Sequence, residues 1–174
     1  LRRRAGPVPE PVDSDRLRAG LERLFPHGNE TDQRRAAAVC ALRRVTVLAG
    51  GPGTGKTTTV ARILTLLHDQ PGPPPRIALA APTGKAAARL KEAVRTAATP
   101  NEPITELSAS TLHRLLGWRP GTTQFRYNRH HRLPYDVVVV DETSMVSLTM
   151  MARLLDAVRP DARLLLVGDP DQLA

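Results

Sequence analysis

Apolar residues recur along this chain in patterns that predict strands alternating with helices. Short runs rich in Val, Leu and Ala are typical of buried strands, and four occur, at 45–49, 76–81, 136–140 and 163–167. Apolar residues repeat with helical spacing in four longer segments, at 13–25, 58–68, 86–98 and 147–158. A further helix opens at 29–33, and we expect its inner face to consist of Ala36, Ala37, Val39, Cys40 and Leu42. In the helix at 147–158 we expect Leu148, Met151, Leu154, Leu155 and Val158 to point inward. This alternation favours an α/β fold, a parallel β-sheet flanked by helices.

The first predicted strand is followed by a glycine-rich loop, Gly50 to Thr57, that fits the phosphate-binding pattern G-x-x-x-x-G-K-[ST]. Its glycines let backbone N–H groups turn inward around phosphate oxygens, and the next helix adds partial positive charge. We expect Lys56 to contact the β- and γ-phosphates of ATP and the Thr57 hydroxyl to bind Mg²⁺. The alternative is a plain glycine turn, which the flanking strand and helix disfavour. The expected nucleotide-binding residues of the loop are Gly51, Pro52, Gly53, Thr54, Gly55, Lys56, Thr57 and Thr58.

Two other strands end in polar residues suited to phosphoryl transfer. The valine run at 136–140 leads into Asp141 and Glu142. We expect Asp141 to hold Mg²⁺ and Glu142 to orient and deprotonate the attacking water. The run at 163–167 leads to Gln172, which could reach the γ-phosphate because ligands of open α/β sheets bind at the carboxyl ends of the strands. The expected catalytic residues are Lys56, Asp141, Glu142 and Gln172.

Three further sites carry weaker signals. Gln33, in the first turn of its helix, could present its amide to adenine. A second strand-to-helix turn contains Thr83 and Lys85, which could grip a nucleic-acid phosphate or could simply cap the helix. Thr111 and His113 open a short helix and could also face a phosphate, although a His beside an apolar face is more often a structural hydrogen-bonder.

The segment 118–135 is basic and holds four aromatic residues, Trp118, Phe125, Tyr127 and Tyr135. Rings interleaved with basic residues suit single-stranded nucleic acid, because bases stack on rings and phosphates pair with cations. A surface hairpin that only covers the sheet explains the same residues equally well.

Composition adds a modest argument for an anionic partner. The net charge is +8, and nucleic acid is the commonest partner of such proteins, but arginine enrichment along the whole chain explains the charge as well. Hydrophobic residues make up 41% of the 174, enough for the core of one domain. Cys40 is the single cysteine and cannot form an internal disulfide, so we expect a cytoplasmic protein. No apolar run approaches the length of a membrane span, and we expect no membrane partner.

Five motifs, GGPGTGKTT, APTGKAA, STLHRLLG, VVVVDETSM and LLLVGDPDQLA, resemble in this order those of superfamily-one DNA helicases, and more narrowly of the RecD family. The resemblance covers residues 29–174. It implies a RecA-like P-loop NTPase domain, with the strand that leads to Gln172 between the nucleotide-loop and Asp-Glu strands. It also implies that Gln33 reads adenine and that Thr83, Lys85 and Thr111 contact single-stranded DNA.

The resemblance further implies a place in a larger enzyme. Residues 1–28 would be a linker and a short helix, and 29–174 the first motor domain of an ATP-dependent 5′-to-3′ DNA helicase. ATP and Mg²⁺ would be its cofactors, and RecB- and RecC-like subunits its partners in recombinational repair of double-strand breaks. Without the second motor domain, which would supply arginines to the transition state, we expect weak ATP binding and no unwinding. The alternatives are a stand-alone or relaxase-linked helicase, or a non-catalytic docking module that uses 118–135.

Overall fold

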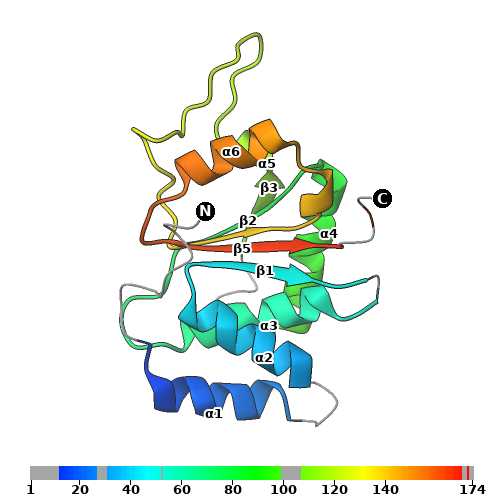
Figure 1. Cartoon of the computed structure of the whole chain (residues 1–174), viewed down its shortest axis with the longest axis vertical. Helices are drawn as coiled ribbons and strands as arrows, with labels where there is room; N and C mark the ends of the chain where they lie inside the picture. Colours follow the sequence, from blue (N-terminus) through cyan, green and yellow to red (C-terminus); the bar gives the residue numbers. More distant parts are fainter. Residues whose placement is uncertain (1–11, 27–30, 52, 99–106, 170–171, 173–174) are drawn as a thin grey trace.

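The computed structural model describes residues 12–26, 31–51, 53–98, 107–169 and 172. These residues form a five-stranded sheet in which every pairing is parallel, in the order β1-β5-β4-β2-β3 (Figure 1). The strands are β1 (Val45–Ala49), β2 (Ile77–Ala81), β3 (Ala109–Thr111), β4 (Val137–Val140) and β5 (Arg163–Gly168). The predicted parallel α/β fold is therefore confirmed, as is the predicted place of β5 between β1 and β4.

Helices cover both faces of the sheet. They are α1 (Ser14–Leu24), α2 (Thr31–Leu42), α3 (Lys56–His68), α4 (Gly84–Ala97), α5 (Leu112–Leu115) and α6 (Leu148–Ala157), with a 3-10 turn, η4 (Thr143–Met145). In Figure 1, α1 to α3 lie on one side of the sheet and α6 on the other. Successive strand side chains point to opposite faces. Accordingly, Val137 and Val139 of β4 join the core under α1 to α3, while Val138 and Val140 join the core under α5 and α6.

β1 corrects the expectation that 45–49 is a buried strand. It lies at the edge of the sheet and, among the described strands, pairs only with β5. None of its five residues is fully buried, and Val47 is 64% exposed. A short apolar run does not distinguish a central strand from an edge strand, because partner strands decide that position.

Two predicted inner faces were also wrong in part. Val39 and Leu42 of α2 were expected to be buried but are 42% and 45% exposed, whereas Ala37, Cys40 and Ala41 are buried. Leu148, the first residue of α6, is 90% exposed, and the buried residues of this helix, Leu154 and Ala157, lie in its second half. The sequence patterns did not predict the short strand β3.

Within the part of the chain that the structure describes, no helix is long and apolar enough to cross a membrane.

Candidate functional site

The carboxyl end of each strand leads into one group of the predicted site residues. Because all five strands are parallel, these ends lie along a single edge of the sheet. Taken in spatial order, β1 leads to the glycine-rich loop, β5 to Gln172, β4 to Asp141 and Glu142, β2 to Thr83 and Lys85, and β3 to Thr111 and His113. The fold thus places the expected nucleotide residues other than Gln33 after three adjacent strands, and the expected DNA residues after the other two.

The loop after β1 curls around the Lys56 ammonium. Gly53 and Gly55 have φ angles of +75° and +76°, a left-handed conformation that glycine adopts without steric cost. Lys56 Nζ donates to the carbonyl oxygens of Gly50, at 2.5 Å, and Gly51, at 2.7 Å. The lysine is therefore in the centre of the loop, where a phosphate ligand would meet it. Pro52, also expected to bind nucleotide, lies outside the described residues.

Gln33 contacts this loop directly from α2. Its side-chain Nε2 donates to the carbonyl oxygen of Thr54 at 3.2 Å, and the Thr54 hydroxyl donates to the carbonyl oxygen of Gly51 at 2.9 Å. A Cβ on Gly55 would lie 3.0 Å from the same Nε2. The structure therefore brings Gln33 to the nucleotide loop, while its contact with adenine stays a prediction.

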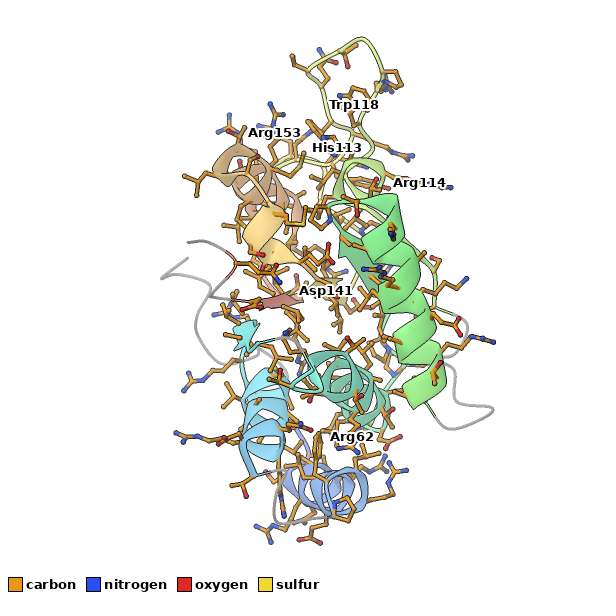
Figure 2. All side chains as sticks on the ribbon, turned by 90° about the vertical axis from the view of Figure 1, so that its right-hand side faces the viewer. Arg62, His113, Arg114, Trp118, Asp141 and Arg153 are labelled. Atoms are coloured by element: carbon orange, nitrogen blue, oxygen red, sulfur yellow. The ribbon has the colours of Figure 1, made fainter. Side chains whose placement is uncertain are left out.

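Asp141 and Glu142 lie at the end of β4 in a tight turn. The backbone N–H of Glu142 donates to Asp141 Oδ1 at 2.8 Å. Glu142 has a φ of +51° and is the only described non-glycine residue with a positive φ. Burial raises the pKa of the Asp141 carboxyl above its usual value, while this N–H and the charge of Lys56 act in the opposite direction. Figure 2 shows Asp141 in the middle of the molecule, at the edge where the strands end.

The carboxylate of Asp141 and the hydroxyl of Thr57 are oxygen ligands of the kind that hold a magnesium ion jointly with a nucleotide. Thr57 is half-buried in the first turn of α3 and brings a hydroxyl oxygen to the same loop as Lys56. No cluster of three or more His, Cys, Asp or Glu side chains that could hold a metal occurs among the described residues. Mg²⁺ commonly binds through one or two carboxylates plus substrate phosphates, and this donor set suits that mode.

Gln172 contacts the turn after Glu142. Its Nε2 donates to Asp169 Oδ2 at 3.2 Å, and the Ser144 hydroxyl donates to Gln172 Oε1 at 3.4 Å. Asp169 is only 6% exposed, and Thr143 donates its hydroxyl to the carbonyl oxygen of Val167 at 2.9 Å. Sequence reasoning missed Thr143, Ser144 and Asp169, because no spacing rule singles out contacts between two separate strand ends.

The expected DNA residues lie together at the other half of the edge. Ala81 pairs with Thr111, so the turn that follows β2 and the helix that follows β3 are neighbours. The Thr83 hydroxyl accepts from the Ala86 N–H at 3.2 Å and caps α4, and the Thr111 hydroxyl accepts from the Arg114 N–H at 3.3 Å. The capped-turn alternative is thus present in the structure. Each hydroxyl still has its proton to donate, and Lys85 is exposed.

His113 leads into an extended loop, residues 117–133, that projects beyond α5 and α6 (Figures 1 and 2). The loop closes on a bridge between Trp118 and Phe125, and both rings contact His113, with centroids 5.8 and 6.1 Å away. The guanidinium groups of Arg153 and Arg126 lie over the rings of Phe125 and Tyr127, respectively. Trp118 is 42% exposed. The stretch from 107 to 135 contains no Asp or Glu, so every charged side chain of this loop is positive.

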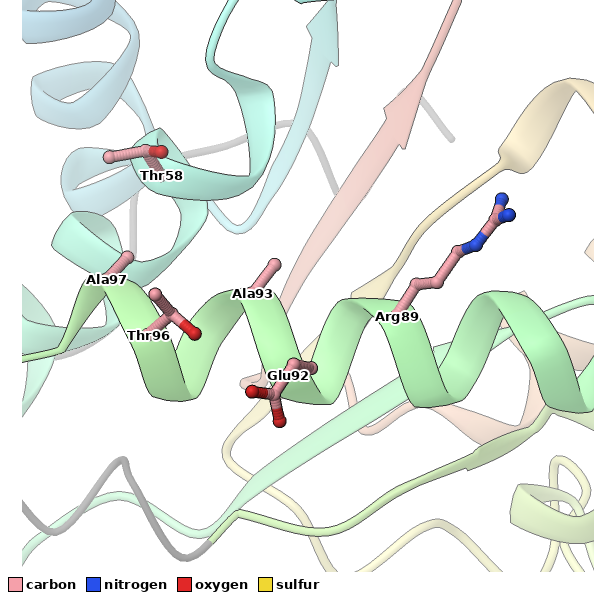
Figure 3. A pocket seen from close by; sticks show the side chains of 6 residues that line it. All are labelled: Thr58, Arg89, Glu92, Ala93, Thr96 and Ala97. Atoms are coloured by element: carbon pink, nitrogen blue, oxygen red, sulfur yellow. The ribbon is translucent and has the colours of Figure 1, made fainter.

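A shallow groove of about 530 Å³ lies beside the start of α3. Figure 3 shows Thr58, one of the expected nucleotide residues, across from Ala93 and Ala97 of α4, with Arg89 farther along that helix. The groove runs along α4 and does not include Lys56 or Asp141. Thr58 therefore lines a separate surface, and its role toward nucleotide stays a prediction.

Comparison with known proteins gives the family to which the chain is similar. Residues 33–174 match a family described as AAA domain. The chain is 63% identical over 164 residues to the RecBCD enzyme subunit RecD of Mycolicibacterium smegmatis, an alignment covering 88% of this chain and 29% of that protein. It is 47% identical over 133 residues to the ATP-dependent RecD2 DNA helicase of Deinococcus radiodurans, covering 76% of this chain and 16% of that protein. The chain thus spans less than a third of the length of these relatives.

Solved structures support the fold independently. The large terminase of bacteriophage HK97 superposes with a TM-score of 0.56 at 17% identity, over 91% of this chain and 38% of that one. The RNA helicase Prp28 from Chaetomium thermophilum superposes with a TM-score of 0.53 at 15% identity, over 91% of this chain and 44% of that one. At such identities the likeness concerns the fold alone.

Proposed function

The chain belongs to the AAA domain family, and from that premise we propose that it is the ATP-binding motor domain of a RecD-type DNA helicase. One observation carries the proposal: the strand order β1-β5-β4 brings the glycine-rich loop, Gln172 and the Asp141-Glu142 pair to adjacent positions on one edge. The similarity of the chain to RecD and RecD2 proteins supports a DNA helicase over other nucleotide hydrolases.

Each residue has a distinct part in the proposed ATP hydrolysis. Backbone N–H groups of the loop and the Lys56 ammonium bind the phosphates and stabilise the charge that develops on them. Glu142 orients the attacking water and accepts its proton, and Gln172 contacts the γ-phosphate. Thr57 and Asp141 would hold Mg²⁺, which would supply positive charge to neutralise the phosphates. Gln33 recognises adenine.

The remaining parts of the proposal concern DNA and partner proteins. We place single-stranded DNA along Thr83, Lys85, Thr111 and His113, beside the nucleotide half of the same edge. We also propose that 29–174 is the first motor domain of the gene product, and that RecB- and RecC-like subunits are its partners in double-strand break repair. The names of the curated relatives support this last step.

ATP turnover by the full-length gene product, with and without single-stranded DNA, tests the proposed function. We expect DNA to stimulate turnover, and Lys56→Ala to lower it by about 10²-fold or more, the usual effect of losing one charge-stabilising donor. Glu142→Gln should bind ATP normally and fail to hydrolyse it. Lys91→Ala is the matched control, because Lys91 is an exposed lysine of α4 and no part of the loop sequence. Turnover that survives Lys56→Ala would contradict the proposal.

A docking module is the second candidate, and the ring contacts of the 117–133 loop favour it. Phe125 and Tyr127 already contact arginines of this chain, which leaves less ring surface for bases. If Thr83→Ala, Lys85→Ala and Thr111→Ala together leave single-strand binding unchanged, docking is the better explanation.

A further inference from the structure

Thr143 links the ends of β4 and β5 beyond the point where their backbone pairing stops. Pairing between β4 and β5 ends at Val140 and Leu166, whereas β5 continues beside β1 as far as Gly168. The Gly168 carbonyl accepts from Gly50 N–H at 3.3 Å and so faces β1. Successive carbonyls of a strand point to opposite sides, so the Val167 carbonyl faces the β4 side, beyond the last paired residue of β4. The Thr143 hydroxyl donates to this carbonyl at 2.9 Å.

Gly168 makes this contact possible. A Cβ added to Gly168 would lie 2.5 Å from Thr143 Oγ1 and 3.7 Å from the backbone nitrogen of Ser144. Any side chain there would push the turn away from β5. The turn that contains Thr143 is therefore in direct contact with the end of β5. The turn contributes the Thr143 hydroxyl, and β5 contributes backbone atoms of Val167 and Gly168.

The same turn holds Glu142 in its unusual conformation. A non-glycine residue with φ of +51° is costly and persists only where neighbouring contacts enforce it. Glu142 N–H donates to Asp141 Oδ1 on one side, and Met145 N–H donates to the Glu142 carbonyl at 3.0 Å on the other. Thr143, the next residue, is the one whose side chain attaches this turn to another strand.

We propose that Thr143 is a positioning residue for ATP hydrolysis. Its hydroxyl fixes the Glu142 turn to the end of β5 and so sets the Glu142 carboxylate relative to Gln172. The Ser144 hydroxyl, 3.4 Å from Gln172 Oε1, adds a second link between the same segments. This inference rests on the proposed function, because it assigns Thr143 a part in the same reaction.

The test compares Thr143→Val with Thr143→Ser in the full-length gene product. Valine keeps the shape of threonine and removes the hydroxyl, whereas serine keeps the hydroxyl and removes the methyl group. With saturating single-stranded DNA, we expect Thr143→Val to lower kcat about 10-fold or more, since small misplacements at a reacting centre are costly. The KM for ATP, nucleotide affinity and Tm should change little, and Thr143→Ser should retain most of kcat. Gly168→Ala should reproduce the kcat defect with nucleotide affinity intact.

Three results would overturn the proposal. The first is normal kcat in Thr143→Val. The second is an equal kcat loss in the valine and serine variants, which would point to methyl packing. The third is a fall in kcat only in step with nucleotide affinity or Tm, which would indicate a merely structural role. Absence of ATP turnover in the unsubstituted protein is distinguishable from all three: it overturns the proposed function, and this inference with it.

Discussion

At the scale of single residues, Asp141 combines a candidate catalytic role with a cost to stability. Its carboxyl is partly buried at the end of β4, and this burial raises its pKa. A carboxyl whose pKa is higher in the folded than in the unfolded chain favours folding most at pH below the unfolded value, and that contribution is lost as pH rises through the folded value. At neutral pH the charged Asp141 therefore disfavours the folded state.

Asp141→Asn should consequently raise the Tm of the purified chain at pH 7 and abolish ATP turnover in the full-length gene product. The rise should be small, because solvent screens a carboxylate that is only partly buried. It should shrink as pH falls, since Asp141 then becomes neutral in both states. Thermal melts from pH 3 to 8 measure it.

Asp136 supplies a control of opposite sign. Its partial burial would raise its pKa, but hydrogen bonds from Arg76 and Arg159 outweigh that and lower it. Such a carboxylate stabilises the fold above its unfolded pKa and loses that contribution in acid. Asp136→Asn should therefore lower Tm at pH 7, with the effect fading toward pH 3. Equal shifts in the two variants would contradict the electrostatic explanation.

At the scale of elements, the basic and aromatic side chains of the 117–133 loop suit either of two partners, single-stranded DNA or another protein. Arg119, Arg126 and Arg129 of this loop are all exposed. Among the described residues, Arg126 lies over the ring of Tyr127, whereas Arg119 and Arg129 lie over no ring. If the loop binds single-stranded DNA, the guanidinium groups of Arg119 and Arg129 pair with DNA phosphates and displace the counterions of those phosphates.

Replacing Arg119 and Arg129 by Gln should then weaken single-strand binding. It should also make the slope of log K against log salt concentration less steep by about 1.4, which is about 0.7 for each lost phosphate contact. Arg18→Gln with Arg43→Gln is the matched control, because both arginines are exposed and lie away from the loop, on α1 and just before β1. Fluorescence anisotropy across a salt series gives both slopes. Indistinguishable slopes in the two double variants would favour the docking explanation.

At the scale of the whole molecule, the relation between this chain and its relatives leads to a third prediction. The chain spans 29% of the Mycolicibacterium smegmatis relative. If an arginine from outside residues 29–174 completes the site, the purified chain should bind ATP yet turn it over about 10³ to 10⁵ times more slowly than the full-length gene product. It should unwind no DNA. Unwinding by the 174-residue chain alone would contradict this prediction.

Much of the architecture was predictable because it depends on local patterns. Four of the five described strands and the helices α1, α3, α4 and α6 followed from apolar spacing, and the capping roles of Thr83 and Thr111 from the chemistry of helix starts. The order β1-β5-β4 came from the resemblance between motifs and not from periodicity. Local patterns failed where packing partners decide exposure, as at Val47 and Leu148.

The sequence by itself determined the conformation of the glycine-rich loop, because the two left-handed glycines and Lys56 act through spacing along the chain. It also determined that β4 ends in two carboxylates. Only the tertiary structure decided that β1 is an edge strand and that Thr143 contacts the end of β5 across Gly168. Those features depend on which strands become neighbours, and contacts between distant segments leave no regular spacing in a single sequence.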